Sequence, residues 1–290
     1  MAKLLFATLL KCYFRSVITL IQLSDCHLLK DKDKAGYAGI APYHSLALVL
    51  QNAVSPYIKR STDDGNVSQP QRDNEHKVIM LVTGDISGDN SLESYQHFTA
   101  LMHYHLANAD IEWYVLAGNH DNNPHFEAVL GERMLKSAKP IVCQRWHIHG
   151  LDTRSSNDNY TAAGELKSED VRSFEKALVS APGNNHIVAL HHHVLPSNSW
   201  MDKHYLDNAS KVVALSEQYS QIKALIHGHV HSPLRHTIGS NNTPAYGSPS
   251  TCWQWKMQAE FGVSDEAPGY QVIELCDDGA VNVTVKRVEK

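Results

Sequence analysis

Five short apolar runs in this chain each end in a cluster of Asp, His or Asn side chains, and this pattern constrains the fold more than any other. The runs are rich in β-branched residues, which favour buried strands. The polar clusters are poorly suited to a protein core, because buried polar groups are costly unless they are paired or bind a ligand. The predicted strands cover residues 16–23, 77–83, 112–117, 186–190 and 221–226.

Apolar residues at helical spacing lie between these strands. An alternation of strand and helix predicts an α/β fold, and short β-rich runs after residue 234 indicate a second sheet. No internal repeat or shift in composition divides the chain, so we expect a single domain over residues 1–290 with a β-rich C-terminal part, 234–290. The predicted helices lie within residues 41–59, 92–106, 124–135, 168–180 and 210–219, and we expect the first to end near Pro56.

The totals describe an ordinary globular protein of 290 residues, with 42% hydrophobic and 20% charged residues. The net charge of -5 argues against a nucleic-acid binder, since such proteins usually carry a basic surplus. Bound divalent cations would reverse the local field, so a phosphate substrate is compatible with this charge. No run approaches the ~18 apolar residues of a membrane span, and we expect no membrane partner.

The five cysteines are odd in number and form no C-x-x-C pair, which favours reduced thiols and a cytoplasmic protein. Residues 1–10 faintly resemble a secretory signal, but no cleavage site follows and Lys11 and Arg15 interrupt the apolar run. Residues 61–76 contain almost no apolar side chain and predict an exposed loop, to which we assign no function.

Gly118-Asn119-His120-Asp121 offers three groups that suit a metal-dependent hydrolytic site. An amide oxygen can bind a hard cation, an imidazole can donate a proton, and a carboxylate can orient that imidazole. Asp25 and His27 are two residues apart, so in extended backbone both side chains point to one side. The pair His229 and His231 repeats this spacing. Gly84 precedes Asp85 and Gly228 precedes His229, and a glycine at each position permits the backbone or a ligand to come close.

Other interpretations are open for several of these polar residues. Asp85 could cap a helix, although Ser91 lies closer to the helix at 92–106 and can do so instead. Of the consecutive histidines 191–193, alternation in a strand lets one bind a metal and leaves its neighbours near the substrate. His147 and His149 share one face of a predicted strand, and we interpret them as residues of a half-exposed strand.

Strands of an open α/β sheet place their carboxyl ends at one rim, where binding crevices form. Seven donors meet there, more than one tetrahedral cation needs, and two ions roughly 3.5–4 Å apart would use all of them. Since none is a thiolate, the set suits Mn, Fe or Zn. The donors are Asp25, His27, Asp85, Asn119, one of His191–His193, His229 and His231.

The motifs D-x-H, G-D, G-N-H-D, H-H-x and G-H-x-H, in this order, resemble those of the calcineurin-like metallophosphoesterase superfamily. The resemblance implies a four-layer α/β/β/α sandwich with two mixed sheets. Local details are similar to the bacterial class III 3',5'-cyclic-AMP phosphodiesterases. These are Tyr95-Gln96-His97-Phe98, Leu190-His191-His192-His193 with Leu195-Pro196, Trp200-Met201-Asp202 and Pro249-Ser250-Thr251-Cys252-Trp253-Gln254.

The resemblance also implies the roles of the site residues. His191 is the preferred ligand and His192 the reserve, because His193 and Val194 stand where relatives have prolines. His120 would contact the phosphate and protonate the leaving oxygen, with Asp121 orienting it. The implied first metal is held by Asp25, His27 and His231, the second by Asn119, His191 and His229, with Asp85 bridging, while Asn119, His120, His27 and His231 surround the substrate.

The implied reaction is hydrolysis of 3',5'-cyclic AMP to 5'-AMP by in-line attack of a hydroxide that bridges two divalent ions. Fe or Mn are the first candidates for these ions, and Zn is a further one. The alternatives are another phosphodiester or phosphomonoester, such as a glycerophosphodiester, a nucleotide diphosphate or a phosphoprotein, or a metal-binding scaffold without catalysis. Trp253, Trp255 and Met257 could form a cap for a base or could serve packing alone.

Overall fold

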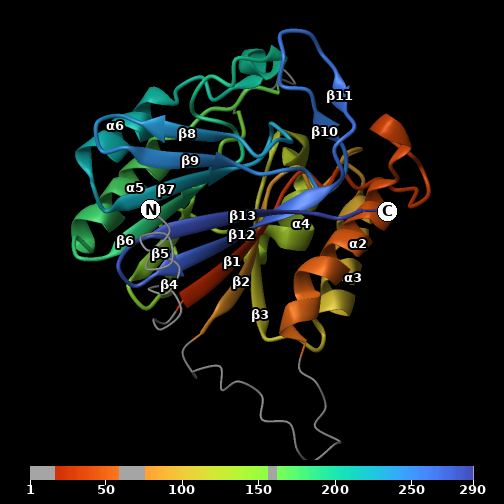
Figure 1. Cartoon of the computed structure of the whole chain (residues 1–290), viewed down its shortest axis with the longest axis horizontal. Coiled ribbons are helices and arrows are strands. Elements are labelled where there is room, and N and C mark those ends of the chain that lie inside the picture. The colour runs from red at the N-terminus through yellow and green to blue at the C-terminus, as the bar shows by residue number, and fades with distance from the viewer. Residues whose placement is uncertain (1–16, 59–75, 156–161, 290) are drawn as a thin grey trace, which may run out of the picture.

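The predicted strands fall into two mixed sheets that pack face to face (Figure 1). The structure, a computed structural model, describes residues 17–58, 76–155 and 162–289. The first sheet has the order β13-β12-β1-β2-β3 and the second β4-β5-β6-β7-β9-β8. The strands are β1 Val17–Leu23, β2 Val78–Thr83, β3 Ile111–Leu116, β4 Ile141–Cys143, β5 Trp146–Gly150, β6 Asn185–Ala189, β7 Ile222–His227, β8 Arg235–Ile238, β9 Thr243–Gly247, β10 Gln254–Trp255, β11 Val263–Ser264, β12 Gly269–Cys276 and β13 Val281–Arg287.

Strand β1 shows why the central runs are continuously apolar. Ile18 and Leu20 pack against the second sheet, whereas Ile21 and Leu23 pack against the helices on the outer face of the first. A strand covered on both faces needs apolar side chains at every position rather than at alternate ones. Strands β1, β2 and β3 are parallel, as are β5, β6 and β7, so the polar residues that follow them leave the sheets in one direction.

Helices cover both outer faces of the paired sheets (Figure 1), which confirms the expected four-layer α/β/β/α sandwich. Helices α2 and α3 pack on the first sheet, and α5 and α6 on the second. The helices are α2 Pro42–Val54, α3 Leu92–Leu106, α4 Pro124–Leu130, α5 Ser168–Ser180 and α6 Ser210–Gln218, with short 3₁₀ turns η2 Tyr37–Gly39, η3 Ser55–Tyr57, η4 Asn119–Asp121, η5 Gly131–Arg133 and η6 Trp200–His204.

Helix α2 ends near Pro56, as predicted: it stops at Val54 and continues as the η3 turn, because Pro56 has no N–H to donate. Helix α4 ends earlier than predicted and gives way to the η5 turn after Leu130. Ser91 caps α3 as expected, since its side chain accepts a hydrogen bond from the Ser94 N–H.

The C-terminal part is β-rich, but most of its strands join the two large sheets, while β10 and β11 pair with each other in a separate two-stranded sheet. β12 pairs antiparallel with β1, while β9 extends the second sheet beside β7. Strand β9 and the hairpin β10–β11 were not predicted; Pro244 in β9 argues against a strand by sequence.

The interpretation of His149 as half-exposed is wrong. His149 is fully buried and only His147 is partly exposed, because α5 covers this face of β5 and places Phe174 on the His149 ring. The predicted loop at 61–76, apart from His76, and the weak N-terminal signal at 1–10 lie outside the described residues. The cysteines within the described part of the chain, Cys26, Cys143, Cys252 and Cys276, are free thiols, as expected.

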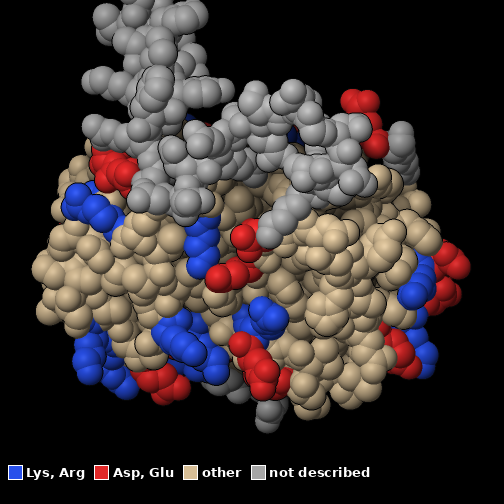
Figure 2. All heavy atoms as spheres, turned by 90° about the horizontal axis from the view of Figure 1, so that it is seen from below, with Lys and Arg blue, Asp and Glu red and all other residues tan. Residues whose placement is uncertain are grey.

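On the face shown in Figure 2, basic and acidic side chains are interspersed among uncharged residues. A protein that tracks a nucleic-acid backbone usually presents a basic stripe, and this face presents none among its described residues. Within the same part of the chain, no helix is both long enough and apolar enough to cross a membrane.

Candidate active site

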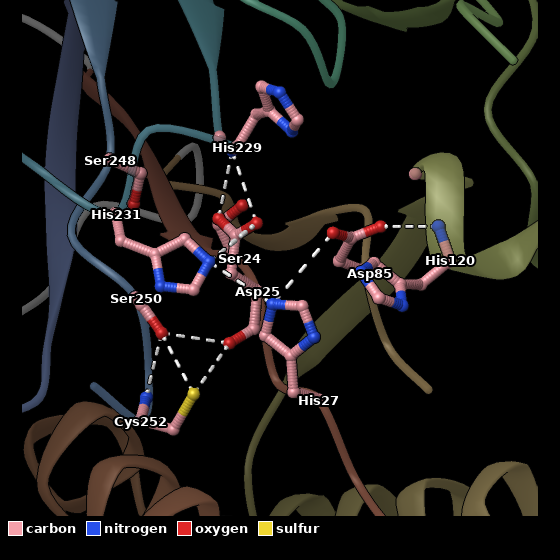
Figure 3. A network of polar contacts seen from close by, with 12 residues as sticks. Ser24, Asp25, His27, Asp85, His120, His229, His231, Ser248, Ser250 and Cys252 are labelled. Atoms are coloured by element: carbon pink, nitrogen blue, oxygen red, sulfur yellow. Dashed lines mark hydrogen bonds and ion pairs between the residues drawn. The ribbon is translucent and has the colours of Figure 1, made fainter. Parts of the chain in front are cut away.

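The predicted site residues meet where the carboxyl ends of strands from both sheets converge (Figure 3). The first sheet contributes the segments after β1, β2 and β3, and the second sheet those after β6 and β7. The structure therefore brings together side chains as distant in the sequence as Asp25 and His231. Asp25 and His27 follow β1, Asp85 follows β2, Asn119 and His120 follow β3, His191 follows β6, and His229 and His231 follow β7.

Asp85 lies at the centre of this group and is almost fully buried. Its Oδ2 atom is 3.4 Å from His191 Nε2 and 3.8 Å from His27 Nε2. Its Oδ1 atom accepts a hydrogen bond of 2.9 Å from the His120 backbone N–H. One carboxylate thus faces imidazoles from both sheets.

Two sets of donors flank Asp85. In one, His231 Nε2 is 3.4 Å from Asp25 Oδ1 and 3.1 Å from His27 Nε2. In the other, His191 Nε2 is 3.2 Å from Asn119 Oδ1, and the rings of His191 and His229 have centroids 5.0 Å apart. Donor atoms of Asp25, His27 and His231 all lie within 4.8 Å of one another, as do those of His191, His192 and His229. Such spacing suits a metal ion between the donors of each set.

Three of the imidazoles are fixed in orientation by backbone carbonyls. A carbonyl only accepts, so the nitrogen that faces it carries the proton and the other nitrogen of a neutral ring has a free lone pair. Histidines that bind metals are held in the same way. The donor set therefore fits divalent cations. The bonds are His191 Nδ1 to Thr83 O at 2.7 Å, His231 Nδ1 to Trp253 O at 2.8 Å and His229 Nε2 to His204 O at 2.9 Å.

His191 and His192 differ in what their ring nitrogens contact. His192 Nδ1 pairs with Thr153 Oγ1 at 2.7 Å, and its Nε2 pairs with the Ala162 carbonyl at 3.1 Å. Both nitrogens are thus engaged away from Asp85, whereas His191 Nε2 points at it. His191 Nε2 is therefore a nitrogen of this segment that faces Asp85.

The expectation of an extended backbone at the paired residues is wrong. The outer residues of D-x-H and H-x-H have positive φ angles and lie in the left-handed region, so strand alternation does not set the direction of their side chains. For residues other than glycine this conformation costs about 1–3 kcal/mol each and is found mainly at functional sites. The φ angles are 55° for Asp25, 46° for His27, 52° for Asp85, 67° for His229 and 45° for His231.

Glycines allow the strand ends to approach each other, as expected for Gly84 and Gly228. A Cβ atom on Gly84 would collide with the His191 ring, and one on Gly228 would collide with Ser24 and the Asp25 carboxylate. Gly118 is packed equally tightly, because a Cβ atom there would overlap the Asp85 carboxylate.

Asp121 is fully buried and ties the loops after β2 and β3 together. Its carboxylate accepts hydrogen bonds from three backbone N–H groups and from the Tyr95 hydroxyl, which lies at 2.9 Å. These bonds fix the turn that carries His120. The expected contact between Asp121 and the His120 ring stays a prediction.

Sequence reasoning gave no role to Ser250 and Cys252, which support the metal-facing turn (Figure 3). The Ser250 hydroxyl and the Cys252 thiol donate to the Asp25 carbonyl at 2.9 and 3.2 Å. The Thr251 N–H donates to the Ser24 carbonyl at 3.0 Å. A run of small polar residues outside any amphipathic pattern was the sequence feature that could have indicated this supporting role.

The charges of the cluster match those of a cation site. Burial opposes ionisation of Asp25 and Asp85, yet neighbouring imidazoles hold the pKa of both carboxyls below the ordinary value. Burial lowers the pKa of His27 to about 3. For His191 burial acts in the same direction, but the Asp85 carboxylate outweighs it and raises the pKa to about 9, so without a metal this ring carries a second proton. Ionised carboxylates and neutral imidazoles are the forms that bind metals, and a cation at this position would displace that proton from His191.

An aromatic wall, defined as Tyr37, Trp253, Trp255 and Phe261, stands beside the site. Trp253 stacks on the His27 ring at 5.3 Å and 19°, and Trp255 stacks on the His231 ring at 4.8 Å and 21°. Tyr37 contacts both indoles, and it and Phe261 are 48% and 53% exposed. The two tryptophans therefore pack on the site, and the wall reaches solvent through the other two rings.

Comparisons with known proteins agree with this geometry. The calcineurin-like phosphoesterase family matches residues 18–233. The chain is 32% identical to the 3',5'-cyclic adenosine monophosphate phosphodiesterase CpdA of Pseudomonas aeruginosa, covering 94% of this chain and 90% of the relative. It is 30% identical to a 3',5'-cyclic-nucleotide phosphodiesterase of a Nostoc species, covering 93% and 92%.

Solved structures resemble the fold at low sequence identity. A dimetal phosphatase from Danio rerio superposes with a TM-score of 0.62 at 11% identity, covering 94% of this chain and 99% of the other. A purple acid phosphatase from yellow lupin gives 0.54 at 13% identity, covering 94% and 52%. Both similarities support the four-layer α/β/β/α architecture.

Proposed function

Because the chain belongs to the calcineurin-like phosphoesterase family, we propose that it hydrolyses 3',5'-cyclic AMP to 5'-AMP at a dinuclear metal centre. The observation that carries this proposal is the position of Asp85 between two sets of metal-binding donors. The relatives that are named as cyclic-nucleotide phosphodiesterases cover most of the chain and support the choice of substrate.

Each donor set would hold one ion, with Asp85 shared between them. Fe or Mn suits the mixed nitrogen and oxygen donors, and Zn is the further candidate. When bound, such a pair supplies a nucleophile at neutral pH by lowering the pKa of water, and it neutralises charge on the phosphate. The first ion would be held by Asp25, His27 and His231, and the second by Asn119, His191 and His229.

His120 is the proposed acid. Its backbone is fixed by Asp85, and its ring meets the His27 ring edge-on, with centroids 5.0 Å apart. From there it would contact the phosphate together with Asn119, His27 and His231. The leaving group of cyclic AMP is the ribose O3' alkoxide, which leaves poorly without a proton donor. Asp121 would act on His120 by holding its turn.

The aromatic wall favours a nucleotide over a substrate without a base. Planar bases stack on aromatic side chains, typically for about 1–3 kcal/mol each. Tyr37 and Phe261 offer exposed rings next to indoles that touch the metal-facing imidazoles. A phosphate between the two donor sets would place a linked base within reach of this wall.

The proposal is tested by stripping the protein of metal, restoring Mn²⁺ and supplying cyclic AMP, with the product separated by chromatography. We expect 5'-AMP and no 3'-AMP, and no turnover by Asp85→Asn under the same conditions. Asp110→Asn, at an exposed position, is the matched control and should retain full activity. Turnover restricted to a glycerophosphodiester, a nucleotide diphosphate or a phosphomonoester in the same assay would contradict the proposal.

A further inference from the structure

A second group of histidines lies at the opposite end of the second sheet. We define the basal histidine cluster as His147, His149 and His186. β5 and β6 are parallel, and His147 pairs in register with His186, while His149 follows two residues later on the same face. His186 is the second residue of β6 and His191 follows its end, so at about 3.3 Å per residue the two sites are roughly 16 Å apart.

The three rings are close enough to share a cation. One ring nitrogen of each lies within 4.8 Å of the others. His149 Nε2 and His186 Nδ1 are 2.9 Å apart, and their rings stack at 5.2 Å. The His147 ring centroid is 5.0 Å from that of His186. His149 and His186 are fully buried, whereas His147 is partly exposed and would give an ion its entry from solvent.

The hydrogen bonds place the protons of the buried pair. His186 Nε2 faces the Ala181 carbonyl at 3.2 Å and must carry a proton, because a carbonyl only accepts. Its Nδ1 then has a free lone pair, and the proton between the two rings belongs to His149 Nε2. The remaining nitrogen, His149 Nδ1, is buried, and the Ser137 backbone lies close enough to this ring to accept a hydrogen bond from it. A shift of the proton to Nδ1 would satisfy that acceptor and free Nε2 for a cation.

The third ring is also available. His147 Nε2 lies 2.8 Å from Asn184 Nδ2, an amide donor, so this nitrogen also presents a lone pair. A cation could replace that one N–H group. Burial lowers the pKa of all three histidines, that of His149 to about 3, so the rings are neutral at physiological pH. Neutral imidazole is the form that binds metal ions.

We propose that His147, His149 and His186 form a further metal site that binds Zn²⁺ through three imidazole nitrogens, with water as the fourth ligand. Three imidazoles select Zn²⁺, Co²⁺ or Ni²⁺ over the harder Mg²⁺ and Mn²⁺. A tetrahedral Zn²⁺ with bonds of about 2.0–2.1 Å needs nitrogens roughly 3.3 Å apart, which small ring rotations provide here. The ion would link β5 and β6. It would take no part in hydrolysis.

The first test counts zinc bound per chain by equilibrium dialysis and elemental analysis. His147→Gln is the variant of choice because this side chain is partly exposed, so the fold should persist and can be checked by circular dichroism. His103→Gln, an exposed histidine on α3, is the matched control. We expect His147→Gln to bind about one zinc fewer than both wild type and control, with Mn²⁺-supported hydrolysis unchanged. Equal zinc content in all three proteins would overturn the proposal.

The second test asks for direct ligation. In the Co²⁺-loaded His147→Cys variant, a thiolate in the cluster should give a sulfur-to-cobalt charge-transfer band that wild type and His147→Gln lack. A folded His147→Cys protein without this band would refute the site. Both tests compare variants at one position, so their result does not depend on how many ions the centre around Asp85 holds or on which phosphodiester it cleaves.

Discussion

The carboxylate of Asp85 lies 3.4 Å from Nε2 of His191, although the two residues follow strands of different sheets. This contact is the point at which the two layers of the sandwich become one site. Everything proposed for the chemistry depends on it, because a carboxylate in this position can serve donors on both sides.

His120→Ala should separate substrates by their leaving groups. A positioned general acid contributes typically about 10²–10⁴-fold, and it matters most when the leaving oxygen is a poor one. We expect a loss in this range for cyclic AMP and a much smaller loss for bis(p-nitrophenyl) phosphate, measured as kcat/KM at saturating Mn²⁺. Equal losses on the two substrates would count against His120 as the acid.

Gly118→Ala should abolish activity through a steric effect on Asp85. The added methyl group would occupy the space of the Asp85 carboxylate, so both donor sets would lose their shared ligand. Gly183→Ala is the matched control, because a Cβ atom there meets nothing within 4 Å. Activity and bound Mn²⁺ should fall together in the first variant and stay at the wild-type level in the second; an active Gly118→Ala enzyme would be incompatible with this geometry.

Tyr37→Ala tests the aromatic wall as a platform for the base. Loss of one stacking ring worth about 1–3 kcal/mol should raise KM for cyclic AMP roughly 5–160-fold while kcat changes little. Ribose 3',5'-cyclic phosphate, which has no base, is the control substrate and should be hydrolysed equally by variant and wild type. If KM for the two substrates rises in parallel, the wall has another role.

Buried His149 should make the metal-free protein sensitive to acid. Its pKa is about 3 in the folded protein and 6.5 when unfolded, so above pH 6.5 both states are neutral and the group has no effect. Below pH 6.5 the unfolded chain takes up a proton that the folded one does not. Stability should therefore fall by about 1.4 kcal/mol per pH unit from this group.

Urea unfolding between pH 7.5 and 5 measures this loss, and the NMR titration of the His149 ring assigns it. We expect the ring signal to stay at its neutral position across the range. A His149 signal that titrates near the ordinary value would show that the ring is not held neutral by its surroundings.

Much of the fold follows from local pattern. Helix α3 begins and ends at the predicted residues, because Ser91 supplies a cap and the apolar stripe is regular. Strand β1 was recognisable because burial on both faces demands a continuous apolar run. Strand β9 was not predicted, since it is formed by parallel pairing with β7 and is not indicated by its own sequence.

The sequence suggested which residues to place in the candidate site, but it did not predict their backbone conformation. Asp25 and His27 carry the right chemistry, yet their left-handed conformations depend on partners far along the chain, such as Ser250 and Cys252, which bind the Asp25 carbonyl. The prediction that His149 is half-exposed was wrong for a related reason, because the burial of this side chain is decided by α5 and not by the alternation within β5.

The central claim is most directly tested by anomalous diffraction from crystals of the protein loaded with Mn²⁺. We predict two anomalous peaks about 3.5–4 Å apart, one on each side of Asp85, the first among Asp25, His27 and His231 and the second among Asn119, His191 and His229. A single peak, or an Asp85 carboxylate that contacts neither ion, would contradict the account.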